Sequence, residues 1–216
     1  MFLYGVTRTG VSAAQLQREI GVTYKTAWRM FKEIRNMMNE DVLTLLGEVE
    51  VDESYFGGKD RNRHISKRSG KRGRGAGGKT PVFGMVERKG KVVAMVVPDT
   101  TAKTILPIVG QRVMPSSMIY SDEYPVYDGL KRNGYQHRRV HHAAGVYVDG
   151  SVSTNTLEGF WSLCKRGISG VNHAVSAKYL GGYINAYSFR WNHRDEKTPM
   201  FRLILDRLAS SGLKQP

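Results

Sequence analysis

Residues 45–56, LLGEVEVDESYF, hold the pattern that decides the fold of this chain. Apolar and polar residues alternate along it, with Val49 and Val51 on one side and Glu50 and Asp52 on the other. A period of two is typical of a β-strand that packs one face on a core. The segment therefore predicts a strand that carries acidic side chains on its second face.

The segments that follow predict an α/β fold. The expected strands cover residues 80–90, 91–100, 117–124 and 135–142, the first two joined as a hairpin by a Lys-Gly turn. The expected helices cover residues 102–113 (interrupted at Pro107), 126–134, 155–168, 176–194 and 198–210. This order of elements predicts a mixed β-sheet flanked by helices.

The N-terminal residues predict a small helical segment that precedes the sheet. A Ser-x-x-Gln capping box opens a helix over residues 12–20, and Thr23 caps a second helix that runs to about residue 39. Lys25 and Arg29 fall outside the apolar stripe of the second helix. Two helices joined by a Gly-containing turn are typical of a helix-turn-helix, although an ordinary helical hairpin has the same pattern. The predicted domains are a helix-turn-helix-like segment, residues 1–44, and a second domain, residues 45–216.

The charge balance indicates a polyanionic partner. The 216 residues include 33 Lys and Arg against 19 Asp and Glu, a net charge of +14. DNA or RNA is the partner that such a charge favours. A membrane surface fits less well, because no apolar stretch is long enough to span a bilayer and the first residues lack the features of a signal peptide. The single cysteine, Cys164, excludes an internal disulfide and a cysteine-rich zinc site. A cytoplasmic protein is expected.

Much of the positive charge lies in residues 57–79, which hold nine Lys and Arg and one acidic residue. A segment so poor in apolar residues predicts a loop, and we expect it to contact DNA phosphates; a solvated loop with incidental charge is the alternative. The loop residues expected to bind DNA are Lys67, Arg68, Lys71, Arg72 and Arg74. Arg190 and Arg194 in the late helix are further expected backbone contacts, although a charged outer face would explain them as well.

Three acidic residues in separate segments could form one site: Asp52, Asp122 in MIYSDEYPVY, and Glu158 in NTLEGFWSLCKRG. Three carboxylates suffice to hold two Mg²⁺ ions, which prefer oxygen ligands and activate phosphodiesters when about 3.5–4 Å apart. Mn²⁺ is a possible substitute. Lys165 follows Glu158 by nearly two helical turns and, with Arg166, would form a cationic edge for a DNA backbone.

Each acid also has a structural reading. Asp52 could be one of several solvated acids on its strand, and Asp122 could form the turn before a proline. Glu158 has the spacing of a capping box with Asn155. His141 and His142 could approach the metals, although packing beside the sheet is the more common role of such histidines.

The strings VDESYFGG, YSDEYPVYDGL and NTLEGFWSLCKRG resemble those of the DDE transposases of bacterial insertion sequences, in the ISXO-type group related to Merlin elements. SAAQLQREIGVTYKTAWRMFKEIR is similar to the family's segment just before the catalytic domain. The likeness covers roughly residues 10–195, with three motifs in the family's order. It departs from the family in lacking the usual cysteine-rich zinc ribbon ahead of the helical segment.

The resemblance implies an RNase H-like fold with a catalytic triad of Asp52, Asp122 and Glu158 and the family's basic residue at Lys165. It implies Mg²⁺-dependent hydrolysis at a transposon end, followed by attack of the freed 3′-OH on target DNA. Because two DNA ends must be held together, a homo-oligomer is expected on DNA. A non-catalytic helix-turn-helix DNA-binding protein and an inactive transposase remnant are the alternatives.

Overall fold

The computed structural model describes residues 1–40, 43–58, 64–67, 78–140 and 155–212. The chain forms two compact units. One unit comprises Met1–Asp41 and Leu163–Pro216, and the other comprises Val42–Ser162. The first break lies close to the predicted boundary after residue 44, whereas the late helices group with the N-terminal ones. The assignment of residues 45–216 to a single catalytic domain remains a prediction.

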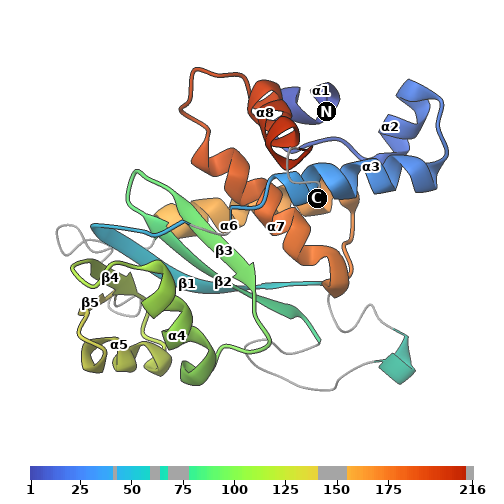
Figure 1. Cartoon of the computed structure of the whole chain (residues 1–216). Helices are drawn as coiled ribbons and strands as arrows, with labels where there is room; N and C mark the ends of the chain where they lie inside the picture. The colour runs from blue at the N-terminus through green and yellow to red at the C-terminus, as the bar shows by residue number, and fades with distance from the viewer. Residues whose placement is uncertain (41–42, 59–63, 68–77, 141–154, 213–216) are drawn as a thin grey trace. The chain divides into compact units, whose positions relative to one another are not determined.

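A five-stranded mixed sheet forms the centre of the unit Val42–Ser162 (Figure 1). Its strands are β1 (Glu48–Phe56), β2 (Thr80–Glu87), β3 (Val92–Val96), β4 (Met118–Ser121) and β5 (Gln136–Arg139). They lie in the order β3-β2-β1-β4-β5. β2 is antiparallel to both of its neighbours, β1 and β3, and β4 and β5 run parallel to β1. The predicted strands and the predicted RNase H-like mixed sheet are confirmed.

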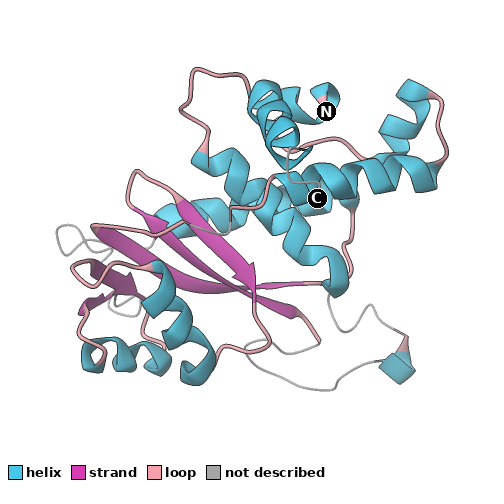
Figure 2. Ribbon diagram, in the orientation of Figure 1, coloured by secondary structure: helices cyan, strands magenta, loops and turns pink. Residues whose placement is uncertain are grey.

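Helices cover the sheet (Figure 2). In this unit they are α4 (Ala102–Arg112), η3 (Pro125–Asp128), α5 (Gly129–Arg132) and the first turns of α6 (Asn155–Gly167). Val49 and Val51 point into a core that includes Ile105 and Val109 of α4. Because side chains alternate along a strand, Glu50 and Asp52 face the other side, where α6 lies.

The predicted interruption of the fourth helix at Pro107 is wrong. α4 runs without a break from Ala102 to Arg112 with Pro107 inside it. Proline removes one backbone hydrogen bond and usually kinks a helix. Here Ile105 and Val109, on either side of the proline, are both fully buried in the core, and their packing holds the two halves in one helix.

In the described residues of the other unit, the regular elements are all helices. They are α1 (Phe2–Val6), α2 (Ala13–Ile20), α3 (Tyr24–Met37), the end of α6, a π-helix η5 (Ile168–Asn172), α7 (Ala177–Asn192) and α8 (Met200–Gly212). The predicted caps of α2 and α3 are confirmed, since Ser12 accepts from the backbone N–H of Gln15 and Thr23 from that of Thr26. α1 has no counterpart among the expected helices.

A partly buried ionic cluster in the helical unit predicts a pH window for the stability of that unit. His193 contacts Glu40 through Nε2 at 2.9 Å, and Arg207 contacts the same carboxylate at 3.1 Å. The hydrogen bond to Glu40 raises the pKa of His193 above 6.5. Although burial alone would raise the pKa of Glu40, hydrogen bonds from His193 and Asn192 hold it below 4.5.

The histidine's contribution is complete below pH 6.5 and is lost as pH rises through its folded-state pKa. The contribution of Glu40 is present above pH 4.5 and is lost as pH falls through its own folded-state pKa. We therefore expect His193→Gln to remove much of the fall in urea-denaturation midpoint between about pH 6 and about pH 9. An unchanged alkaline slope in this variant would show that the cluster does not govern stability.

Candidate catalytic site

Two of the three predicted acids lie on neighbouring parallel strands. Asp52 belongs to β1, and Asp122 directly follows the last residue of β4. The parallel register places Glu50 beside Tyr120. Two further residues along each strand lead to Asp52 and Asp122, so the sheet itself brings these two side chains to the same end of the two strands.

The environment of Asp52 disfavours its charged form. Burial, followed by the negative charges of Glu53 and Asp122, raises the pKa of Asp52 from 3.8 to about 7. The indole Nε1 of Trp161 donates a hydrogen bond to Asp52 Oδ2 at 3.1 Å and favours the carboxylate in part. A carboxylate in such surroundings gains from any positive charge placed beside it, including a metal ion.

Glu50 attaches the start of α6 to the sheet. Its side chain is 1% exposed and accepts hydrogen bonds from the backbone N–H of Leu157 and the hydroxyl of Thr156, both at 3.0 Å. Arg88 Nε donates to the same carboxylate at 3.2 Å. The first turn of a helix has N–H groups without partners in the helix, and Glu50 supplies one of them with an acceptor. The expectation of a solvated acidic face on β1 is therefore wrong at Glu50, because α6 covers it.

Glu158, the third predicted acid, lies in the first turn of α6 and is exposed. It precedes Trp161, the donor to Asp52, by three residues, which places the two on neighbouring positions of the helix surface. In the described part of the chain, no three Asp, Glu, His or Cys side chains are close enough together to hold a metal ion. The structure thus brings Asp52 and Asp122 to the same end of β1 and β4 and places Glu158 one helical turn before Trp161, without closing a three-ligand site.

Because Gly84 has no side chain, α6 can pack closely against the sheet beside Asp52. Gly84 pairs with Asp52 across β1 and β2. A Cβ at Gly84 would lie 2.5 Å from Cζ2 of Trp161, closer than real contacts permit. Any other residue would therefore push the indole away from the sheet and from the carboxylate.

We expect Gly84→Ala to lower the free energy of unfolding by about 1–3 kcal/mol, as overpacking does in tightly packed cores. Gly110→Ala is the matched control, because Gly110 of α4 has nothing within 4 Å of the added methyl group. That substitution should be neutral or slightly stabilising. Urea denaturation of both variants measures the difference, and equal effects would contradict the close packing of Trp161.

The sequence reasoning missed Glu50, Trp161 and Tyr127 as parts of this neighbourhood. Tyr127 is buried and donates its hydroxyl to Glu53 Oε2 at 2.8 Å. Burial, with the charges of Glu53, Asp52 and Asp122, raises the pKa of Tyr127 well above 10. Tyr127 lies in the same motif as Asp122, and Trp161 in the same motif as Glu158. Their proximity in sequence to two of the predicted acids was a signal, but aromatic side chains alone are typical of a core.

Comparison with known proteins identifies the family. The family model for the ISXO2-like transposase domain matches residues 44–192. The chain belongs to this transposase family. The predicted ISXO-type resemblance is confirmed, and the matched region includes β1, β4 and α6 with their three acids.

Two relatives support the same identification. The transposase is 34% identical over 198 residues to an uncharacterized protein in transposable element ISH50 of Halobacterium salinarum, covering 87% of this chain and 67% of that protein. It is 28% identical over 125 residues to an uncharacterized transposase-like protein of Haemophilus influenzae, covering 58% of this chain and 98% of that one.

A solved structure of a simian T-cell lymphotropic virus intasome in complex with PP2A regulatory subunit B56 gamma contains a similar chain. The match has a TM-score of 0.37 and 12% identity, and it covers 82% of the transposase and 61% of that chain. This likeness is too distant to add to the fold described above.

The residues predicted to bind DNA differ in their exposure, and some of them lie outside the described residues. Lys25 and Arg29 on α3, and Lys165 and Arg166 on α6, are exposed. Lys67 belongs to the short helix η2 (Ile65–Lys67). Outside the described residues lie Arg68, Lys71, Arg72 and Arg74, together with His141 and His142.

The prediction that Arg190 contacts DNA is contradicted by its position. Its side chain is 8% exposed, and its guanidinium donates to the backbone carbonyls of Tyr4 and Thr7. These two buried hydrogen bonds connect α7 to the N-terminal residues. Arg194 lies over the ring of Trp191 at 4.7 Å and pairs with Asp195 at 3.3 Å, and its side chain stays partly accessible.

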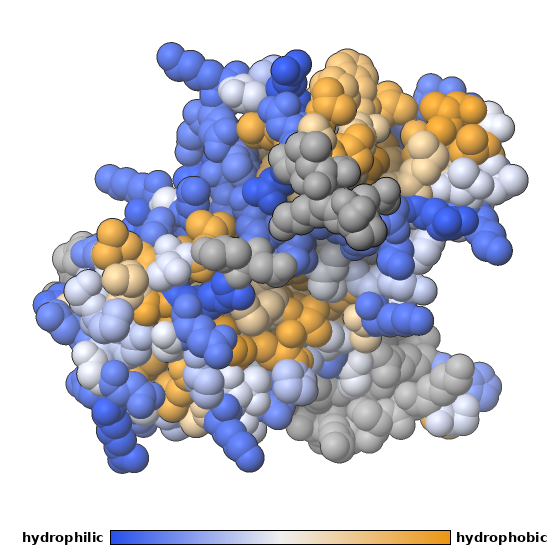
Figure 3. All heavy atoms as spheres, viewed as in Figure 1, coloured by the Kyte–Doolittle hydropathy of each residue, from blue (hydrophilic) through white to orange (hydrophobic). Residues whose placement is uncertain are grey.

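No described helix of the transposase is both long enough and apolar enough to pass through a bilayer. Cys164 and Trp161 of α6 are buried. Hydrophilic side chains project from many parts of the face in Figure 3, in keeping with the net charge of +14.

Proposed function

We propose that this protein is a DDE-type polynucleotidyl transferase that cuts DNA at the ends of an insertion sequence and joins them to target DNA. The observation that carries the proposal is the pair of carboxylates at the same end of two adjacent parallel strands, Asp52 on β1 and Asp122 directly after β4, with the pKa of the partly buried Asp52 raised. Like charges at close range are costly unless a cation compensates them. Membership of a transposase family supports phosphodiester chemistry at this pair.

Divalent ions, Mg²⁺ or Mn²⁺, would be held by Asp52, Asp122 and Glu158. The donor set fits, because carboxylate oxygens are the ligands that hard cations prefer, and burial together with the negative charges of Glu53 and Asp122 raises the pKa of Asp52. Bound at this site, two such ions supply a reactive nucleophile and stabilise charge on the phosphate and the leaving oxygen.

The protein's own groups would orient this site. Trp161 Nε1 fixes one oxygen of Asp52, which leaves the other for a metal or a water. Glu50 anchors the first turn of α6 and thereby sets the height of Glu158 above β1. Closure of the site would require the exposed side chain of Glu158 to turn toward Asp52.

DNA is the proposed substrate and partner. The net charge of +14 favours a polyanion, and Lys165 and Arg166 would place positive charge on the same helix as Glu158. Lys25 and Arg29 on α3 would contact the DNA backbone from a helix-turn-helix. Because two transposon ends must be cut in one complex, a homo-oligomer on DNA is the proposed working form.

The test uses duplex DNA that carries the sequence flanking the coding region, incubated with purified protein. With Mg²⁺ or Mn²⁺ we expect strand breaks that leave a 3′-OH at the element's end, and joined products when target DNA is present. EDTA should abolish both. Binding without metal-dependent breaks would favour the non-catalytic DNA-binding alternative, and breaks without joining would indicate a nuclease.

A further inference from the structure

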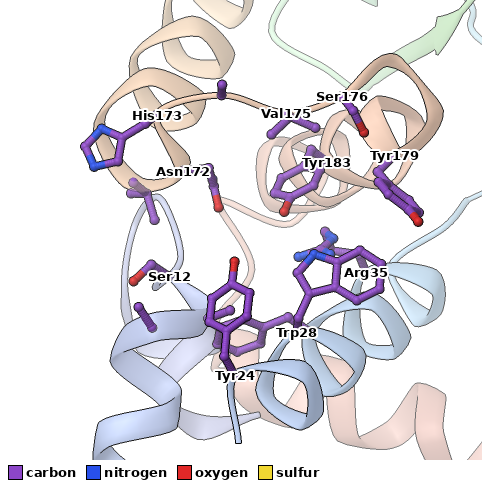
Figure 4. A pocket seen from close by; sticks show the side chains of 15 residues that line it. Ser12, Tyr24, Trp28, Arg35, Asn172, His173, Val175, Ser176, Tyr179 and Tyr183 are labelled. Carbon is purple, nitrogen blue, oxygen red and sulfur yellow. The ribbon is translucent and has the colours of Figure 1, made fainter.

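The helical unit contains a pocket of about 460 Å³ that the proposed chemistry does not use (Figure 4). It lies between α3, the start of α7 and the segment that joins η5 to α7. Pockets of roughly 300–1,000 Å³ are the size that holds small ligands. All of its lining residues belong to the unit made of Met1–Asp41 and Leu163–Pro216.

Aromatic side chains form the walls of this pocket. The ring-bearing residues that line it are Tyr24, Trp28, Phe31, Tyr179 and Tyr183. Trp28 and Tyr179 meet edge to face with ring centroids 4.9 Å apart. Figure 4 shows Tyr24 and Tyr183 extending toward each other from α3 and α7 across the opening. Flat aromatic faces around an open space are a surface on which a planar ring can stack.

Arg35 brings a buried positive charge to the wall of the pocket. It is 4% exposed, and its guanidinium lies 4.0 Å from the ring centre of Tyr183. Among the residues that the structure describes, the Arg35 guanidinium has neither a hydrogen-bonding nor an ion-pairing partner. A buried guanidinium without an anion is costly, and its five N–H donors match the oxygens of a phosphate. The charge therefore points to an anionic ligand.

Positive side chains lie on the stripe of α3 next to the one that lines the pocket. Tyr24, Trp28 and Arg35 lie on one stripe of the helix, because their spacing of four and seven residues returns to nearly the same side. The exposed Lys25, Arg29 and Lys32 form a parallel stripe about 100° further around the helix. A polyanionic chain could run along this stripe while one of its units enters the pocket.

The rim at residues 172–174 has an unusual backbone. His173 has φ 57° and ψ −50°, and the N–H of Ala174 donates to the carbonyl of Asn172 at 2.6 Å. This is a three-residue turn of the strained type, which non-glycine residues seldom adopt. Strain of this kind is often kept where a loop holds a ligand. The turn supports a binding role for the pocket, which Arg35 and the aromatic walls indicate independently.

We propose that this pocket receives an unpaired nucleotide of a DNA strand, with its base against the aromatic walls and its phosphate at Arg35. The flanking phosphates would lie along Lys25, Arg29 and Lys32. The choice of DNA as the ligand rests on the proposed function. An acidic protein segment would satisfy Arg35 but would leave the aromatic faces without a planar partner, so it is the less suitable ligand.

The experiment measures DNA binding by fluorescence anisotropy with full-length protein, without divalent metal. The probes are a labelled duplex with an unpaired single-stranded overhang, the same DNA with abasic overhang positions, and a blunt duplex. Tyr24→Ala removes a ring that is 54% exposed, so the fold should tolerate it. Phe2→Ala, at a ring that is 59% exposed and outside the pocket, is the matched control. Arg35→Met removes the buried charge.

Tyr24→Ala is expected to weaken binding of the overhang probe by about 5- to 100-fold, the range that loss of one stacked base produces. Its binding to the abasic and blunt probes should equal that of the wild type. Arg35→Met should weaken binding of the overhang probe by a similar factor, and Phe2→Ala should leave the binding of all three probes unchanged. If circular dichroism shows that Arg35→Met does not fold, the comparison of Tyr24→Ala with the wild type still tests whether a base binds in the pocket.

Three outcomes would overturn the proposal. Wild-type protein could bind the abasic overhang as tightly as the normal one, or Tyr24→Ala could weaken all three probes equally. A deoxynucleoside monophosphate could compete as well as the overhang DNA, which would assign the pocket to a free nucleotide. The binding assay measures no cleavage. A negative binding result therefore does not bear on metal-dependent strand cleavage, and a lack of cleavage does not bear on binding to the pocket.

Discussion

Asp52→Asn is expected to abolish metal-dependent strand cleavage, with a loss on the order of 10³-fold or more. Metal ions contribute several kcal/mol to the stabilisation of charge in phosphoryl transfer, and about 4 kcal/mol corresponds to a factor of 10³. Glu158→Gln and Asp122→Asn should give losses of the same order, because each would remove one of three shared ligands. The measurement is single-turnover cleavage of an end-containing duplex, with DNA binding followed in parallel.

The same substitution should stabilise the metal-free protein at neutral and alkaline pH. The pKa of Asp52 is raised from 3.8 to about 7, so the folded state retains a proton that the unfolded state releases. The wild-type protein therefore loses stability as pH rises between these two values, whereas Asp52→Asn should not. If Asp52→Asn loses cleavage activity but has a higher urea-denaturation midpoint than the wild type in EDTA, the loss comes from a missing metal ligand and not from misfolding. A variant that is less stable and still cleaves DNA would contradict both expectations.

Glu50→Ala is expected to cost about 3–5 kcal/mol in the free energy of unfolding, the range for breaking a buried ion pair. The substitution would leave the Leu157 N–H and the Thr156 hydroxyl without their acceptor and remove one partner of Arg88. Hydrogen exchange at the Leu157 amide should accelerate, because this amide is bonded to Glu50 itself.

Glu48→Ala is the matched control for this prediction. Glu48 contacts the same Arg88 at 3.1 Å, but its side chain is 50% exposed. Exposed ion pairs contribute about 1 kcal/mol or less to stability, so the urea-denaturation midpoint of Glu48→Ala should differ little from that of the wild type. Comparable losses in the two variants would show that burial of Glu50 is not what holds α6 on the sheet.

The order of elements was predictable because most of them carry a strong local signal. The alternation in β1 identified a strand, and the capping residues Ser12 and Thr23 marked the starts of α2 and α3. Pro107 misled because a proline's local preference was overcome by packing of its neighbours in the core. Local preference therefore succeeded where tertiary packing agreed with it.

The details of the site depended on contacts between distant segments. Glu48 and Glu50 have the same place in the alternating pattern, but only Glu50 is covered by α6, more than a hundred residues later in the chain. Arg190 looked like a surface cation, and its burial depends on carbonyls of Tyr4 and Thr7 at the other end of the sequence. Pattern alone carries no information on which of several charged residues a distant helix will bury.

The proposed metal site is tested most directly by anomalous diffraction from crystals of the protein with an end-containing DNA and Mn²⁺. Two manganese peaks about 3.5–4 Å apart are predicted, with oxygens of Asp52, Asp122 and Glu158 as their protein ligands. Manganese bound elsewhere, or a DNA-bound structure in which Glu158 points away from Asp52 and Asp122 with the ions absent, would contradict the proposed catalytic role.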